Sequence, residues 1–509
     1  TRRLSTKLGL GDLNVVGSEV PIPAEQEVSS KSVPFLDRLQ PAIPPPGEQF
    51  LVRLDPLGDL PATISGISID TRTIRPGDLF VALKDVRDGH DFVPQAYESG
   101  AGACLVSREI SDVPALYVED TLDALVKLGL AARARTSAFC CAVTGSVGKT
   151  SVKEMLAQIF SAFGPSHWNV KSFNNHFGVP ITLARMPADT ERAVFEIGMN
   201  TPGEIAPRSE MVRPHAAMIT KIAPAHLEGM GSEDAVALEK AAIFAGLLEN
   251  SAAILPAASS YFEFLKTELY RYCSSARVYT FGTDASDAYV LGSTSDGVES
   301  TFTIQVLGET AQVTINAVGA HWGENVVAAV LMAAISGLTV QQAVAALEGY
   351  APPEGRGRAE WLVMADDGKA LLVDDAYNAN PESMRAALAS FQHRPASRRI
   401  IALGEMKELG PDADALHAAL APQILACNPA HVFLAGEGMK PLRDALSESV
   451  NTVWAEKASG LQEKVNKLLT DGDALLIKGS NASGMRSLAD ALREGSEAHA
   501  KRGDGVRAN

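Results

Sequence analysis

Short apolar runs and amphipathic stretches follow one another along most of this 509-residue chain. The apolar runs have the length of buried strands. Residues 151–160 show the other period, because Val152, Met155, Leu156 and Ile159 fall on one face of a helix. Strands that alternate with helices in this way predict an α/β fold of mainly parallel sheets with helices on both faces.

The same pattern predicts where the elements lie. Strands are predicted at residues 64–69, 79–83, 103–106, 138–143, 193–197, 216–222, 252–255, 371–374, 399–403, 432–435 and 474–478. Helices are predicted at residues 92–99, 122–135, 151–160, 232–248 and 323–336. Residues 277–316 are predicted to be rich in strands.

The chain divides into a tail and three predicted domains. Residues 1–48 contain seven prolines and no lasting period, which predicts a disordered or extended tail. Residues 49–135 form a small α/β unit, residues 136–350 a central domain, and residues 351–509 a doubly wound third domain. Pro352, Pro353 and the Gly-Arg-Gly-Arg run at 355–358 mark the second boundary.

Residues 144–150 read Thr-Gly-Ser-Val-Gly-Lys-Thr, between a predicted strand and a predicted helix. Such a loop surrounds a phosphate chain with backbone N–H groups, and the helix N-terminus adds partial positive charge. Lys149 is predicted to reach the β- and γ-phosphates of a nucleoside triphosphate, and Thr150 to hold Mg²⁺. The general pattern has glycine at the position of Val143, whereas this chain has Gly145. An ordinary strand-to-helix turn is the alternative.

Composition narrows the class of protein. A net charge of −16 with no cluster of Lys and Arg argues against nucleic-acid binding. The five cysteines show neither metal-binding spacing nor a disulfide framework, which predicts reduced thiols. The longest apolar stretch, residues 326–335, is about half of a membrane span, and the N-terminus has no apolar signal core. We therefore expect a soluble cytoplasmic protein without a membrane span.

Polar side chains follow several of the predicted strands. Glu196 ends one strand and His226 follows another, and ligands gather at the carboxyl ends of parallel strands. Glu196 is therefore a candidate metal ligand, with a strand carboxylate paired to an arginine as the alternative. His226 is a site candidate or a surface histidine. Asn174 and Asn175 are candidates for phosphate binding or for capping the next helix.

A pair of carboxylates, Asp374 and Asp375, ends a strand in the third predicted domain. Pro381 suits the first residue of the following helix, with Asn380 as its cap. Paired carboxylates at a strand end can bind a ribose diol or act as a general base. A turn with a helix cap would explain the asparagines but not both aspartates.

Together these motifs resemble those of the Mur ligases, the ATP-dependent amide ligases of peptidoglycan synthesis. The matching strings are Asp70-Thr-Arg72 and residues 76–83, 88–92, 144–155, 174–180, 196–200, 202–204, 224–231, 374–384, 403–410 and 478–480. They follow the order of the family. The string Tyr377-Asn-Ala-Asn-Pro381 is similar to that of the members that add D-alanyl-D-alanine.

The resemblance implies a role for each domain. The first would bind the UDP part of a UDP-N-acetylmuramoyl-tripeptide, the second ATP, and the third the incoming D-alanyl-D-alanine. ATP would phosphorylate the tripeptide carboxylate, and the dipeptide amine would then displace phosphate. We expect small-molecule substrates, no nucleic acid and a monomer.

The resemblance also implies residue roles. ATP would be bound by Thr144, Gly145, Ser146, Val147, Gly148, Lys149, Thr150, Ser151, His321, Asn325, Arg358 (at the γ-phosphate) and Asp374 or Asp375 (at the ribose). Mg²⁺ would be held by Thr150, Glu196, His226 and Lys240, the last as a carbamylated lysine. Substrates would contact Thr71 and Arg72, at the uridine diphosphate, and Asn174, Asn175, Tyr377, Asn378 and Asn380. Catalysis would depend on Lys149, His226 and Lys240.

The chain departs from the family pattern at several positions. Lys240 is followed by Ala241 and Ala242, where an acidic residue two places on is more usual, so its carbamylation stays open. Glu405 stands in place of aspartate and Asn481 in place of arginine, and the proline-rich segment replaces the usual start of the first domain.

Three alternatives remain open at the level of sequence. They are a diaminopimelate- or lysine-adding ligase, a folate polyglutamate ligase, and a phosphotransferase that uses the same kind of loop. The base that deprotonates the dipeptide amine also stays open, with His226 and Asp375 as candidates.

Overall fold

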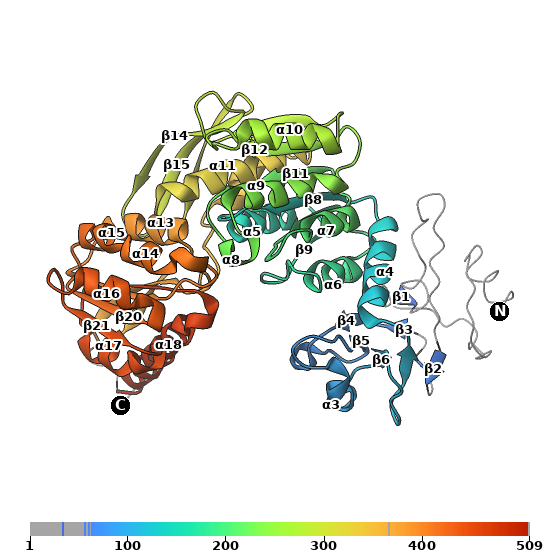
Figure 1. The fold of residues 1–509 in the computed structure, drawn as a ribbon, viewed down its shortest axis with the longest axis horizontal. Helices are drawn as coiled ribbons and strands as arrows, with labels where there is room; N and C mark the ends of the chain where they lie inside the picture. Colours follow the sequence, from blue (N-terminus) through green and yellow to red (C-terminus); the bar gives the residue numbers. More distant parts are fainter. Residues whose placement is uncertain (1–32, 35–54, 58–59, 62, 365–366, 507–509) are drawn as a thin grey trace.

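The computed structural model describes residues 33–34, 55–57, 60–61, 63–364 and 367–506. The tail predicted for residues 1–48 lies outside the described residues, except for β1 (Val33–Pro34), which pairs with β3 (Thr63–Ile64). Three bodies, each built on its own sheet, follow one another along the chain, with the central one between the other two (Figure 1). The α/β fold class is confirmed.

The first body has a five-stranded sheet in the order β2-β7-β6-β5-β4. Its elements are β2 (Asp55–Leu57), β4 (Gly66–Ser68), η1 (Thr71–Thr73), β5 (Asp78–Val81), η2 (Gly89–Phe92), α3 (Val93–Glu98), β6 (Ala103–Val106), β7 (Ala115–Tyr117) and α4 (Thr121–Ala134). Only β2 runs antiparallel to its neighbour in this sheet. Helix α4 leads out to the central body and packs there against α6 (Gly178–Arg185). Gly129 permits this close contact, because a Cβ there would lie 3.0 Å from the Pro180 carbonyl oxygen.

The central body has a nine-stranded sheet in the order β16-β15-β14-β13-β12-β11-β8-β10-β9. Its strands are β8 (Phe139–Thr144), β9 (Ser166–Trp168), β10 (Arg192–Glu196), β11 (Ala216–Ile219), β12 (Ala252–Pro256), β13 (Arg277–Phe281), β14 (Ala288–Ser295), β15 (Ser300–Val306) and β16 (Glu309–Ile315). Its remaining helices are α5 (Lys149–Ser161), α7 (Ile205–Val212), α8 (Leu227–Met230), α9 (Glu233–Ala241), η3 (Ala242–Gly246), α10 (Phe262–Tyr272), α11 (Ala320–Ile335) and α12 (Val340–Leu347). The strands from β9 to β14 in the sheet order pair in parallel, and β15 and β16 pair in an antiparallel manner.

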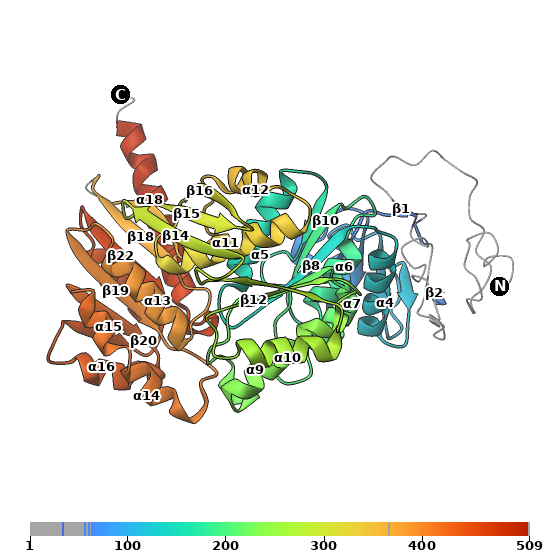
Figure 2. The same cartoon turned by 90° about the horizontal axis from the view of Figure 1, so that it is seen from above.

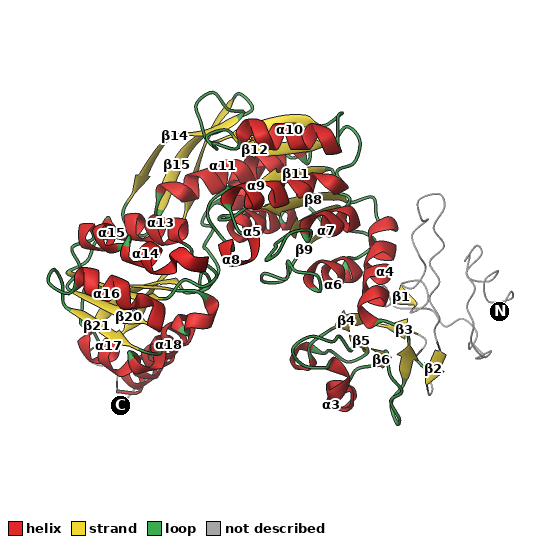
Figure 3. Ribbon diagram, in the orientation of Figure 1, coloured by secondary structure: helices red, strands yellow, loops and turns green. Residues whose placement is uncertain are grey.

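Alternation along β8 explains why helices cover both faces of the central sheet. Cys141 and Val143 point to the core that contains α5, α11 and α12. Cys140 and Ala142 point to the opposite core, which contains α6, α7, α9 and α10. The two faces are visible from above in Figure 2 and by element type in Figure 3. Adjacent cysteines thus serve as core residues in two different layers.

The third body has a six-stranded sheet in the order β17-β18-β22-β19-β20-β21, parallel except for β17. Its strands are β17 (Arg358–Val363), β18 (Lys369–Asp375), β19 (Arg398–Gly404), β20 (His431–Ala435), β21 (Thr452–Ala455) and β22 (Asp473–Lys478). Its helices are α13 (Pro381–Gln392), η4 (Gly410–Asp412), α14 (Ala413–Ala418), α15 (Ala421–Ala426), η5 (Glu437–Met439), α16 (Lys440–Leu446), η6 (Ala458–Gly460), α17 (Gln462–Leu468), η7 (Asn481–Ser483) and α18 (Met485–Val506). No helix of the described residues has the length and apolar content needed to cross a membrane.

Among the predicted elements that end early, two are informative about the site and its packing. The helix predicted at 232–248 becomes the 3₁₀ segment η3 after Ala241. There Ser209 of α7 donates to the Ile243 carbonyl, and Gly246 lies against the Ser209 carbonyl oxygen, so packing against α7 determines the winding. The strand predicted at 216–222 ends at Ile219, because the next residues bind the phosphate loop instead of a neighbouring strand.

Candidate active site

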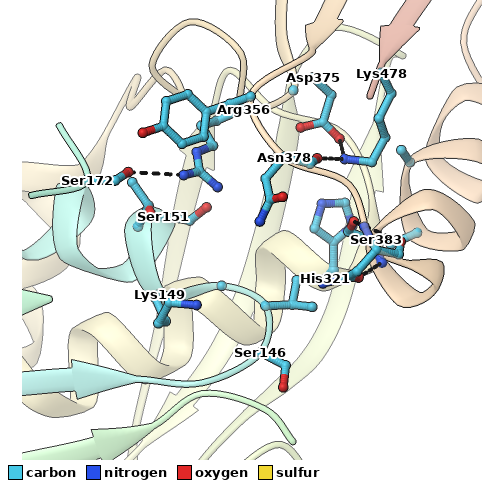
Figure 4. Close-up of a pocket in the computed structure, with 18 of the residues that line it drawn as sticks. Ser146, Lys149, Ser151, Ser172, His321, Arg356, Asp375, Asn378, Ser383 and Lys478 are labelled. Atoms are coloured by element: carbon cyan, nitrogen blue, oxygen red, sulfur yellow. Dashed lines mark hydrogen bonds and ion pairs between the residues drawn. The ribbon is translucent and has the colours of Figure 1, made fainter. Parts of the chain in front are cut away.

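A polar cavity of about 560 Å³ lies where the central and third bodies meet. The carboxyl ends of β8 and β10 and the start of α11 form its central wall. The ends of β18 and β22 and one face of α13 form its third-body wall. Figure 4 shows Lys149 on one side of the space, Asp375 and Lys478 on the other, and Arg356 beside Ser172. Residues separated by more than 300 positions therefore face one cavity, at the sheet edge where ligands of α/β folds gather.

The phosphate loop owes its shape to two glycines. Gly145 and Gly148 have φ angles of 147° and 90°, and α5 starts directly after Gly148. A Cβ at Gly145 would lie 2.0 Å from Thr220 Oγ1, and one at Gly148 would lie 2.8 Å from Asn325 Oδ1. Val143, where the general pattern has glycine, is fully buried inside β8 and needs no such freedom.

Residues 220–223, which follow β11, fix this loop through hydrogen bonds. The Thr220 hydroxyl donates to the Val147 carbonyl at 2.6 Å, and the Ser146 N–H donates to the Lys221 carbonyl at 2.7 Å. The Ser146 hydroxyl donates to the Ala223 carbonyl at 2.7 Å. Ser146 to Ser151 all line the cavity, whereas Thr144 and Gly145 support the loop from outside the lining.

Lys149 and Thr150 occupy the start of α5. Lys149 Nζ donates to the Gly145 carbonyl at 2.6 Å, so the side chain folds back over the loop. Burial lowers the pKa of Lys149; the charge of Arg356 lowers it further and Glu196 opposes the shift. Thr150 donates to Glu196 Oε2 at 2.9 Å. These contacts bring the loop and the end of β10 together.

Glu196 is a buried carboxylate, 1% exposed, whose partners are neutral. Besides Thr150 it accepts from Asn174 Nδ2 at 2.6 Å, and no Lys, Arg or His nitrogen of the described residues lies within ion-pair distance of it. A buried charge without a counter-ion favours a bound cation. The Thr150 hydroxyl and the Glu196 carboxylate are the oxygen ligands that Mg²⁺ prefers, completed by water and phosphate oxygens. The residues present therefore fit Mg²⁺.

The other two predicted metal ligands contact other partners. His226 lines the cavity, but its Nδ1 lies 2.5 Å from Glu408 Oε2 of the third body. Lys240 is 1% exposed and does not line the cavity; its Nζ contacts Met199 Sδ at 3.6 Å. Burial, followed by the charge of Lys149, lowers the pKa of Lys240 well below its ordinary value. Within the described ranges, no three His, Cys, Asp or Glu side chains gather as a metal cluster.

The two predicted asparagines have different roles. Asn175 Oδ1 accepts from the backbone N–H groups of Phe177 and Gly178, at 3.2 and 2.9 Å, and so binds N–H groups at the start of α6. Asn174 instead orients Glu196. Both line the cavity.

Asp374 and Asp375, at the end of β18, have different partners, and only Asp375 lines the cavity. Asp374 is 1% exposed, accepts from the N–H groups of Gly355 and Ala376, and pairs with Arg493, so it serves the fold and does not line the cavity. Asp375 lines the cavity and lies 2.7 Å from Lys478 Nζ. Burial raises the pKa of Asp375, although Lys478 opposes this.

The turn after β18 carries the remaining predicted substrate residues. Tyr377, Asn378 and Asn380 all line the cavity. Asn380 and Ser383 form a reciprocal capping box at the start of α13, as the sequence pattern predicts for Asn380. The Asn378 carbonyl accepts from Lys478 at 2.9 Å.

Two arginines in the 355–358 run have different positions. Arg358, the predicted γ-phosphate ligand, is exposed at the start of β17 and does not line the cavity. Arg356 does line it, lies 4.1 Å above the Tyr377 ring and donates to Ser172 Oγ at 3.2 Å. The sequence contained both arginines, but the turn at Gly357, with φ of 85°, separates their directions.

His321 and Asn325, at the start of α11, line the cavity as the resemblance implies. Burial lowers the pKa of His321 to about 4, so the ring is neutral. Thr71 and Arg72 belong to the first body, away from this cavity. Arg72 is bound in a two-point contact to Asp70. Neither Lys478 nor Arg356 was a predicted site residue, although a lysine that ends a buried strand was a usable signal.

Known protein families match this chain in three consecutive segments. Residues 63–132 match the Mur ligase family catalytic domain, residues 143–333 the Mur ligase middle domain, and residues 357–481 the Mur ligase glutamate ligase domain. The UDP-N-acetylmuramoyl-tripeptide--D-alanyl-D-alanine ligase of Escherichia coli is 36% identical and covers 85% of this chain and 94% of its own length. The Bacillus subtilis protein of the same name is 32% identical over 85% of this chain and 93% of its own length.

Solved structures agree with these matches. MurF from Acinetobacter baumannii superimposes with a TM-score of 0.74 at 28% identity, covering 85% of this chain and 94% of that one. MurF ligase from Thermotoga maritima, solved in complex with ADP, has the same fold, with a TM-score of 0.71 at 22% identity and coverage of 85% and 98%. The resemblance seen in the sequence motifs is therefore confirmed, and the chain belongs to the Mur ligase family.

Proposed function

We propose that this protein is an ATP-dependent, ADP-forming ligase that joins D-alanyl-D-alanine to UDP-N-acetylmuramoyl-tripeptide in peptidoglycan precursor synthesis. The observation that carries the proposal is the shared cavity, in which a phosphate loop and the Tyr377 turn face each other. Relatives that share more than 30% of their residues over most of this chain bear the name of that ligase. A hydrolase would need the loop but no second wall for an organic acceptor.

The chemistry requires activation of a carboxylate. A carboxylate oxygen is a poor leaving group, so the tripeptide carboxylate first takes the γ-phosphoryl group of ATP and releases ADP. The neutral amine of D-alanyl-D-alanine then attacks the acyl carbon, the amide bond forms, and phosphate leaves with one former carboxylate oxygen. The phosphoryl step depends mainly on positioning and on neutralising charge.

We assign the phosphate end of ATP to the loop of residues 145–151, with Lys149 leaving the Gly145 carbonyl to bind the β- and γ-oxygens. Arg356 is suited to neutralise charge on the transferred phosphoryl group, because it lines the cavity while contacting Ser172 of the central body and Tyr377 of the third. Asp375, and not Asp374, faces the cavity for the ribose hydroxyls. Mg²⁺ at Thr150 and Glu196 would reduce the repulsion between ATP and the carboxylate.

Lys240 is our proposed site of carbamylation. Its Nζ is buried and its lowered pKa favours the neutral amine, the form that adds CO₂. A carbamate would replace this neutral amine with an anion beside Lys149. Protein exchanged into ¹³C-bicarbonate should show a carbamate carbonyl signal that Lys240→Ala lacks; a wild-type spectrum without that signal contradicts the assignment.

The decisive assay measures phosphate release. We expect release to require ATP, Mg²⁺, UDP-N-acetylmuramoyl-tripeptide and D-alanyl-D-alanine together, with diaminopimelate- and lysine-containing tripeptides compared side by side. Lys149→Ala should lower turnover by about 10³-fold, as the removal of a group that stabilises developing charge does. Phosphate release without the dipeptide, or ligation of a free amino acid in its place, would contradict the proposal.

The proposal includes two further expectations. The location is cytoplasmic, where ATP and nucleotide-linked precursors are available. The active form is a monomer, because one chain supplies both walls of the cavity. Light scattering coupled to size-exclusion chromatography checks the second expectation, and a stable dimer would contradict it.

A further inference from the structure

A contact between the central and third bodies involves His226, a residue that lines the cavity. His226 follows β11 at the start of α8 and has a φ of 55°. Its Nδ1 lies 2.5 Å from Oε2 of Glu408, in the loop after β19, and Glu408 has a φ of 62°. Left-handed backbone is uncommon for residues other than glycine and persists where the surroundings specify it. The surrounding structure therefore specifies the backbone at both ends of this contact.

The backbone reinforces the side-chain contact. The N–H of Glu228, in α8, donates to the Glu408 carbonyl at 3.2 Å. The Glu408 loop is fixed within its own body, because the Ser480 hydroxyl donates to the Glu405 carbonyl at 2.7 Å and the Gly438 N–H donates to the Glu405 carboxylate. Glu408 thus approaches His226 from a supported loop of the third body.

The contact determines what the imidazole can do. A carboxylate can only accept from Nδ1, so Nδ1 carries the proton, and in the neutral ring Nε2 is then the unprotonated nitrogen. A ring held at one nitrogen by a carboxylate presents the other in a fixed orientation. His226 lines the cavity, and its Nε2 is the nitrogen left available to ligands there.

We propose that Glu408 of the third body is a positioning residue that fixes the tautomer and orientation of His226 in the central body. The His226 side of the cavity is then complete only when the third body contacts the central body. This rests on the proposed function for its kinetic consequence, but not for the state of the ring. Motif residues 403–410, which the substrate assignments leave without a role, acquire one.

A second ion pair across the same boundary provides a matched control. Lys221 Nζ lies 2.5 Å from Glu382 Oε1, and neither residue lines the cavity. Glu382→Ala removes a contact between the same two bodies without touching His226. If Glu408 only docked the two bodies, its loss and the loss of Glu382 would have the same effect on His226. If Glu408 positions the ring, only its loss changes the tautomer of His226.

The test uses the full chain with ¹⁵N-labelled histidine, and compares Glu408→Ala, Glu408→Gln and Glu382→Ala with wild type. Without substrates, the His226 nitrogen shifts should report the Nδ1–H tautomer in wild type, in Glu408→Gln, whose amide oxygen still accepts, and in Glu382→Ala. Glu408→Ala should shift His226 toward the Nε2–H tautomer. In the ligase assay, Glu408→Ala should lower kcat about tenfold with little change in KM for the dipeptide, and Glu408→Gln should restore most of the loss.

Two results would overturn the inference. One is an unchanged tautomer in Glu408→Ala. The other is an equal shift in Glu382→Ala, which would assign Glu408 to docking alone. Absence of ligase activity in the wild-type protein would instead contradict the proposed function, and the tautomer comparison would still decide the role of Glu408.

Discussion

The two walls of the cavity are built in different ways. The central wall presents the backbone of the phosphate loop, fixed by Gly145 and Gly148 and bound by Thr220, together with the side chains of Lys149, Thr150 and Glu196. The third-body wall presents side chains, chiefly Asp375 paired with Lys478. The backbone N–H groups of the phosphate loop can bind only what every triphosphate shares, whereas the side chains of the third-body wall can distinguish ligands. We infer that the central wall binds the triphosphate of ATP and that the third-body wall selects the amine from which the amide is made.

The strongest way to break the central wall is Gly145→Ala. The new Cβ would lie 2.0 Å from Thr220 Oγ1 at a φ of 147°, so the loop must shift. We expect kcat/KM for ATP to fall about 10³-fold, because the N–H groups that stabilise charge would be displaced. Steady-state phosphate release measures this.

The control for backbone strain is Gly282→Ala. Gly282 also has positive φ, 108°, but a Cβ there meets nothing within 4 Å. Its activity should stay close to that of wild type. A comparable loss at both positions would show that conformation in general, and not the contact with Thr220, causes the effect.

Loss of one charge of the Asp375–Lys478 pair should destabilise the protein more than loss of both charges. Lys478 is 1% exposed, and Lys478→Met would leave Asp375 without its cation. We expect the free energy of unfolding to drop by about 3 kcal/mol, with much of it regained in Lys478→Met/Asp375→Asn. Chemical denaturation checks both variants. A double variant less stable than the single one would contradict this account of the wall.

The smallest expected effect separates two neighbouring arginines. Arg356→Lys should lower kcat/KM about tenfold, because lysine lacks the planar guanidinium that stacks on Tyr377. Arg358→Lys, on the exposed start of β17, should have little effect. The reverse order in a kinetic comparison would place the γ-phosphate ligand at Arg358, as the family resemblance implied.

The difference between the walls also explains what the sequence could predict. The phosphate loop is local in sequence, so its glycines, Lys149 and Thr150 could be recognised from residues 144–150 alone, and β8 and α5 with them. Strand periodicity placed Glu196 at the end of β10. The choice of Asp375 over Asp374 and of Arg356 over Arg358 depends on which way a turn or strand faces the cavity. Residue type does not contain that information.

Other outcomes depend on tertiary contacts. The Glu408–His226 pair joins residues 182 positions apart, and no local pattern predicts it. The early ends of α9 and β11 follow from packing against α7 and from hydrogen bonds to the phosphate loop. Lys240, carried over from the resemblance as a metal ligand, lies outside the lining and against Met199, so its role stays a prediction.

The formation of an acyl phosphate, the step to which Lys149 is assigned, can be tested by following an oxygen atom. The tripeptide would be labelled with ¹⁸O in both oxygens of the terminal carboxylate and incubated with unlabelled ATP, Mg²⁺ and D-alanyl-D-alanine. We predict that each phosphate released carries one ¹⁸O atom and that the new amide retains the other. Unlabelled phosphate formed together with the amide product, measured by mass spectrometry, would contradict the central claim.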